Sequence, residues 1–74
     1  MQLGTRWSVG TTPPANLPQP VLDEIAAVEA EIAHLDTVQW RWTLTWLEGK
    51  PVCELDDGTI IRFDGEHAAV VPAP

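Results

Sequence analysis

The spacing of apolar residues changes along the chain, and each change predicts a new element. Residues 3–9 alternate: Leu3, Thr5, Trp7 and Val9 fall on one side, and polar or small residues fall on the other. Because successive side chains of a strand point to opposite faces, this period of two predicts a short N-terminal strand. The pattern leaves open whether this strand joins a larger sheet.

Residues 10–18 interrupt the alternation. The segment is rich in Gly, Thr and Pro, and Pro removes a backbone donor and fixes φ, so neither a helix nor a central strand tolerates this composition. We expect an extended, polyproline-like connector. A ligand for an SH3-type domain is the alternative, but the segment offers no good PxxP pair beside a basic residue.

Residues 19–35 carry apolar side chains at three- and four-residue spacing, which predicts an amphipathic helix. Pro20 suits the first turn, and we place Asp23 and Glu24 in the opening turn, where negative charge favours the helix dipole. The apolar stripe is expected to cover a sheet. Dimerisation through it is the alternative, but two heptads are too few to indicate a coiled coil. The stripe consists of Leu22, Ile25, Val28 (or Glu29), Ile32 and Leu35.

From residue 38 the period returns to two, and the apolar positions now include three Trp. Strict alternation over 38–46 predicts a strand with one face on the core and the other in water. A slip of one residue would expose three indoles, so the register is strongly specified. The apolar face of this strand consists of Val38, Trp40, Trp42, Leu44 and Trp46.

The remainder of the chain, to residue 71, has the rhythm of a β-meander. A break at 48–50 ends the first of these strands, and Pro51 opens the next. Asp57-Gly58 and Asp64-Gly65 are dipeptides typical of two-residue hairpin turns, so they predict two further hairpins, with a last strand over 66–71. The inward positions of the middle strands are predicted to be Cys53, Leu55, Ile61 and Phe63.

Together these elements predict an α+β fold in which one amphipathic helix packs on a three- to five-stranded antiparallel β-meander over 38–71. The chain has 74 residues, which corresponds to a single small domain, 1–74. It contains four Trp. Large aromatic side chains are one way for a domain without disulfides or metal to bury enough surface, because each can bury about 150–250 Å².

Charge and cysteine content narrow the classes of partner. Eleven acidic residues against four basic ones give a net charge of −7, whereas nucleic-acid binding draws most of its affinity from Lys and Arg. We therefore expect no nucleic acid and no anionic membrane as partner. The single Cys excludes an intramolecular disulfide. A free thiol, and an N-terminal stretch unlike a secretion signal, favour a cytoplasmic location.

The residues most often used in catalysis are few. His34, near the end of the predicted helix, and His67, at the start of the last strand, have ordinary structural explanations. Cys53 is interpreted as a small buried hydrophobe, and its meeting with His67 across the meander is the catalytic alternative. The Asp-Gly carboxylates are explained by turn geometry rather than by a metal site. We predict no enzyme activity, no cofactor, no metal site and no small-molecule substrate.

Binding to another protein remains as the favoured function: an adaptor, regulator or accessory subunit, with a homodimer as a further possibility. A helix of 17 residues is about 25 Å long, but a strand of ten residues spans about 33 Å. One helix is therefore expected to leave part of the indole row exposed for a partner. The alternatives are a small enzyme or metal-dependent accessory factor using Cys53, His34 or His67, and an acidic nucleic-acid mimic formed by Asp23, Glu24, Glu29 and Glu31. The predicted partner-binding residues are Trp7, Trp40, Trp42, Trp46, Glu24 and Glu31.

Overall fold

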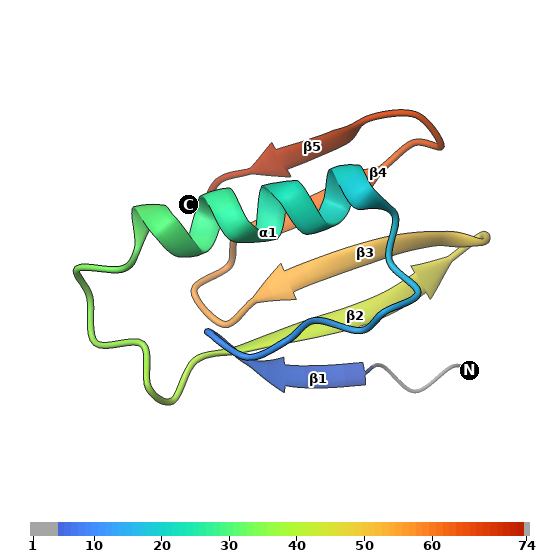
Figure 1. The fold of residues 1–74 in the computed structure, drawn as a ribbon. Helices are drawn as coiled ribbons and strands as arrows, with labels where there is room; N and C mark the ends of the chain where they lie inside the picture. The colour runs from blue at the N-terminus through green and yellow to red at the C-terminus, as the bar shows by residue number, and fades with distance from the viewer. Residues whose placement is uncertain (1–4, 74) are drawn as a thin grey trace.

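The computed structural model describes residues 5–73 and shows one helix packed on a five-stranded antiparallel sheet (Figure 1). The strands follow one another in the order β1-β2-β3-β4-β5, and α1 is inserted between β1 and β2. The predicted α+β meander is therefore confirmed. The elements are β1 (Thr5–Ser8), α1 (Gln19–Glu31), β2 (Arg41–Leu47), β3 (Lys50–Leu55), β4 (Ile60–Phe63) and β5 (Ala68–Val71).

The N-terminal strand joins the sheet, which the sequence left open. β1 pairs antiparallel with β2, and Trp7 lies opposite Trp42 in this register. β1 and β5 form the two edges of the sheet. Of the predicted strand 3–9, residues 3 and 4 lie outside the described residues, and Val9 follows the last residue of β1.

The helix begins at Gln19 as predicted, but it ends at Glu31 rather than at residue 35. Ile32 has φ −101° and ψ 9°, and the backbone bonds then tighten to three-residue turns, such as Leu35 N–H to Ile32 O at 2.9 Å. Leu35 is 45% exposed. Ile32, directly after the helix, still packs against the core, so core packing ends within the following turn, before Leu35.

The buried stripe of α1 is also displaced from the predicted one. Val21, Ile25 and Val28 are buried, whereas Leu22 is only half-buried. The first turn carries no acidic residue, because Asp23 lies one turn further along than predicted. Pro20 does occupy the first turn, where its missing N–H costs nothing.

The indole strand begins later than predicted. β2 starts at Arg41, and Val38, expected on the core face, is 79% exposed. A carboxylate oxygen of Asp36 accepts the Val38 N–H at 3.3 Å, and the Trp40 N–H donates to Thr37 O at 2.9 Å. These local bonds form a turn that competes with the strand, because Asp side chains readily bond the backbone two residues on.

The two-residue hairpin lies at Glu48-Gly49, where the sequence indicated only a break. Glu48 and Gly49 have φ of 54° and 78°, the positive values that two-residue turns of this kind require. The two Asp-Gly dipeptides lie instead in four-residue loops, at 56–59 and 64–67. In both, the Asp side chain accepts backbone N–H groups beyond it, as from Thr59 to Asp57 at 2.8 Å, which closes a wider loop.

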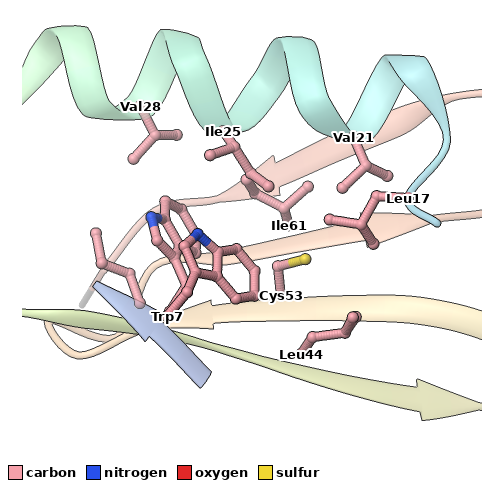
Figure 2. Packing of buried hydrophobic residues seen from close by; sticks show 10 residues of the cluster. Trp7, Leu17, Val21, Ile25, Val28, Leu44, Cys53 and Ile61 are labelled. Carbon is pink, nitrogen blue, oxygen red and sulfur yellow. The ribbon is translucent and has the colours of Figure 1, made fainter. Parts of the chain in front are cut away.

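The core lies between one face of the sheet and α1 (Figure 2). The predicted inward residues of β3 and β4 are buried there, except that Phe63 is half-buried. The connector before α1 crosses the same face of the sheet (Figure 1), and its Leu17 is buried in the core. The core consists of Trp7, Leu17, Val21, Ile25, Val28, Trp42, Leu44, Cys53, Leu55 and Ile61.

Candidate functional site: the open face of the sheet

The predicted indole row is divided between the core and its margins. Trp42 is completely buried, and Trp7 stacks on it with ring centroids 6.2 Å apart and an interplanar angle of 15°. Trp40 and Trp46, at the two ends of the row, are half-buried against the core. Neither Trp7 nor Trp42 is available to a partner in this fold. A partner-binding role of Trp40 and Trp46 stays a prediction.

The opposite face of the sheet carries neither the helix nor the connector. Each of its residues alternates with a buried neighbour, so its side chain points away from the core. Leu47 is 59% exposed and Val71 is 45% exposed on this open face, and Val52 and Ile60 lie half-buried between them. The register places Val52 beside Arg62, and Ile60 beside Val71. The open face therefore offers exposed apolar side chains at the end of β2 and at the end of the edge strand β5, with the half-buried Val52 and Ile60 on the strands between them.

All the basic residues of the chain lie on this open face. Each neighbours a buried residue along its strand, as Arg62 neighbours Ile61 and Lys50 neighbours Pro51. Of the eleven acidic residues, only Glu54 points outward from within these strands. Asp56, Glu48 and Asp64 lie in the turns and loops that border this face, and α1 carries four acidic residues and no Lys or Arg. The basic residues are Arg6, Arg41, Lys50 and Arg62.

One corner of the open face is held by Asp56. Its carboxylate accepts the backbone N–H of Arg41 at 3.0 Å and lies 3.6 Å from the guanidinium of Arg6. The Asp56 N–H also donates to Arg41 O at 3.1 Å. This ion pair is exposed and contributes little stability. The ion pair with Asp56 does orient the Arg6 side chain, whereas Lys50 and Arg62 form no ion pair with any residue in the range 5–73.

A hollow of about 260 Å³ lies between these last two cations. Its apolar lining comes from Leu47, Val52 and Phe63, and Glu48 and Asp64 belong to its rim. Backbone N–H groups of His67 and Glu66 lower the pKa of the Asp64 carboxyl, so this part of the rim is ionised at neutral pH. The hollow can accept an apolar side chain with a charged group beside it.

The predicted acidic residues of the helix lie on different sides of α1. Glu29 turns inward: it accepts hydrogen bonds from Trp42 Nε1 at 2.9 Å and from Gly10 N at 3.3 Å. Glu24 lies on the opposite flank, in a hollow of about 270 Å³ shared with Ala68 of β5. Glu31 follows Glu24 by seven residues and therefore projects from the same flank. The four carboxylates proposed as a nucleic-acid mimic do not form one continuous row.

The candidate catalytic groups are dispersed. Cys53 is buried, and this burial raises the pKa of its thiol to about 11, which keeps it protonated at neutral pH. His34 lies exposed in the turn after α1, and His67 lies in the loop before β5 rather than in the predicted strand. Within residues 5–73, no three His, Cys, Asp or Glu side chains are arranged to hold a metal ion.

The described helix is too short and too polar to span a bilayer. Comparison with known proteins adds no functional assignment. No family model, no curated protein and no solved structure matches this chain.

Proposed function

We propose that this protein is a non-catalytic interaction module that binds an acidic protein partner through the open face of its sheet. The observation that carries the proposal is the gathering of every Lys and Arg of an acidic chain on one face, around exposed apolar residues. A partner with carboxylates around an apolar side chain complements both features. Complementary charge mainly sets orientation and association rate, while the apolar contacts supply affinity.

The same charges argue against a symmetric dimer through this face. A two-fold axis would bring the cations of Lys50 and Arg62 toward the same cations of a second copy, and like charges brought together at an interface cost several kcal/mol. A different chain whose carboxylates lie opposite Lys50 and Arg62 avoids this repulsion. A cytoplasmic location belongs to the proposal, and the free thiol of Cys53 supports it.

The protonated, buried state of Cys53 supports the non-catalytic part of the proposal, because the thiolate is the reactive form of Cys. A cheap test replaces Cys53 by Ala and, separately, His67 by Ala. Binding is expected to survive both changes. Loss of the cellular phenotype with the fold intact would instead favour the alternative of a small enzyme.

The proposal is tested with a synthetic peptide in which Glu alternates with Val and Leu. The ¹⁵N-labelled protein is titrated with this peptide, and chemical-shift changes are expected at outward residues such as Thr45, Val52 and Arg62. Reversing two charges, in the variant Lys50→Glu with Arg62→Glu, is expected to weaken binding at least tenfold. Added salt is expected to weaken binding of the unaltered protein, since these groups are exposed.

A control variant adds negative charge elsewhere. Ala26 and Ala27 are exposed on α1, so Ala26→Glu with Ala27→Glu adds two negative charges without touching the open face, half of the charge change made by the double reversal. This control is expected to bind like the unaltered protein. If net charge alone governs binding, the control will lose half as much binding free energy as the charge-reversed variant, and unchanged binding by the charge-reversed variant would refute the proposed face.

A further inference from the structure

The second surface of interest is the free edge of β5. In an antiparallel pair, alternate residues direct their N–H and C=O groups to the neighbouring strand, and the others direct theirs outward. Among residues 5–73, β5 pairs with β4 alone, so its outward groups form an unpaired row at this edge of the described sheet. Such a row is a template for another extended chain.

The two edge strands of the sheet differ in their charged side chains. Charged side chains on an edge strand are a common device against unwanted pairing. β1 carries Arg6, whereas β5 consists of Ala68, Ala69, Val70 and Val71 and has no charged residue. β5 is thus an edge strand without charged side chains, and its side chains are small enough to let a second backbone approach.

The helix places acidic side chains beside this edge. Glu24 shares a hollow with Ala68, at the start of β5. α1 and β5 run in the same direction in Figure 1. The seven residues from Glu24 to Glu31 rise about 10 Å along the helix, and the three steps from Ala68 to Val71 cover about 10 Å of strand. Glu31 therefore projects from the same side of α1 as Glu24, about 10 Å further along the direction in which β5 runs.

We propose that the edge of β5 accepts an extended segment of a basic protein as a sixth strand. Its main chain would pair with β5, its Lys or Arg side chains would alternate toward the flank formed by Glu24 and Glu31, and its apolar side chains would extend the open face beside Val71. Main-chain bonds supply affinity in such strand addition, and alternate side chains supply specificity. This edge borders the open face at Val71, but it is engaged through the main chain of β5 and the carboxylates of α1, so different variants test the two proposals.

A second copy of the chain does not fit this edge. Pairing β5 with β5 of another copy would bring two acidic flanks toward each other across the dyad, where Glu24, Glu31 and also Glu66 would repel their counterparts. A basic segment gains attraction from the same carboxylates. The charge of the flank therefore selects a heterologous strand over a homodimer.

The test uses a seven-residue peptide in which Lys alternates with Val, with three analogues. One analogue replaces Lys by Glu, and the other two carry backbone N-methyl groups on one edge or on the other. Binding of the parent peptide is measured by fluorescence anisotropy and mapped by amide shifts in β5. We expect the Glu analogue not to bind, one N-methyl analogue to bind like the parent, and the other to lose at least tenfold in affinity.

The protein variant for this test is Glu24→Gln with Glu31→Gln, which is expected to weaken binding of the parent peptide about tenfold. Asp36→Asn removes one charge away from this edge and serves as the control, with unchanged binding. Equal binding of both N-methyl analogues would show adhesion by charge alone and would overturn the proposal. Shifts confined to β1 or to the open face, or dimerisation of the protein without peptide, would also overturn it.

Discussion

The indole N–H of Trp42 donates a hydrogen bond of 2.9 Å to the carboxylate of Glu29, and this bond ties the central part of the sheet to the helix. Trp42 is completely buried, so without Glu29 its polar atom would have lost water and gained nothing. The same oxygen accepts the N–H of Gly10, at the start of the connector, at 3.3 Å. One carboxylate thus joins α1, β2 and the segment after β1.

Replacing Glu29 by Ala should therefore destabilise the protein by about 1–3 kcal/mol, the typical cost of leaving a buried donor unsatisfied. Glu29→Gln keeps an acceptor and should cost less. Urea denaturation followed by far-UV circular dichroism measures both. Glu31→Ala, on an exposed position of the same helix, is the control and should stay within about 0.5 kcal/mol. Equal losses for the two Ala variants would mean that the bond contributes nothing.

The stacked pair Trp7 and Trp42 should respond unequally to substitution. Trp7 Nε1 is buried and has no hydrogen-bond partner within residues 5–73, whereas Trp42 Nε1 is satisfied by Glu29. Trp7→Phe removes an unsatisfied donor together with some ring area. Trp42→Phe removes similar ring area but leaves the carboxylate of Glu29 without its indole donor. We expect Trp42→Phe to cost at least about 1 kcal/mol more. The free energies of unfolding of the two variants, measured by urea denaturation in the same buffer, test this difference.

Periodicity predicted the strands better than it predicted their ends. The alternation over β2 correctly predicts that Trp42 and Leu44 are buried, because a period of two arises when one face of a strand packs on the core. Val38 continues the same alternation but is exposed, because its backbone N–H donates to the Asp36 side chain and the chain turns there. The spacing of apolar residues does not reveal such a local hydrogen bond. Burial of Leu17 was also missed, since a lone apolar residue among prolines has no period.

The candidate site was less accessible to sequence reasoning than the fold. Arg6, Arg41, Lys50 and Arg62 are scattered in sequence, and only the register of the sheet gathers them on one face. A signal was present for three of them: Arg6, Arg41 and Arg62 each precede or follow a residue of the predicted core face. Lys50 lies in the predicted break at 48–50 and had no such signal. Glu29 was ambiguous in the helical stripe, because spacing places it at the margin and only the position of Trp42 shows why it turns inward.

The hairpin between β2 and β3 contains residual strain that substitution can relieve. Glu48 has φ of 54°, a left-handed conformation that costs a residue with a Cβ roughly 1 kcal/mol or more and that Asn tolerates better. Glu48→Asn should raise the free energy of unfolding by about 0.5–1 kcal/mol. Gly49→Ala, at φ 78°, should lower it instead. Thermal unfolding midpoints of both variants measure the effect, and a lower midpoint for Glu48→Asn would contradict the conformational argument.

The buried thiol of Cys53 should make stability depend on pH in alkaline solution. Burial raises its pKa from 9.0 to about 11, so between these values the unfolded chain loses a proton that the folded chain retains. Stability is then fully present below pH 9 and falls as the pH rises through the folded pKa, by up to about 2–3 kcal/mol. Urea midpoints at pH 8 and pH 10.5 should show this fall. Cys53→Ala will start lower, because it leaves a cavity, but should lose less between the two pH values. An equal fall in both proteins would assign the alkaline transition to other groups.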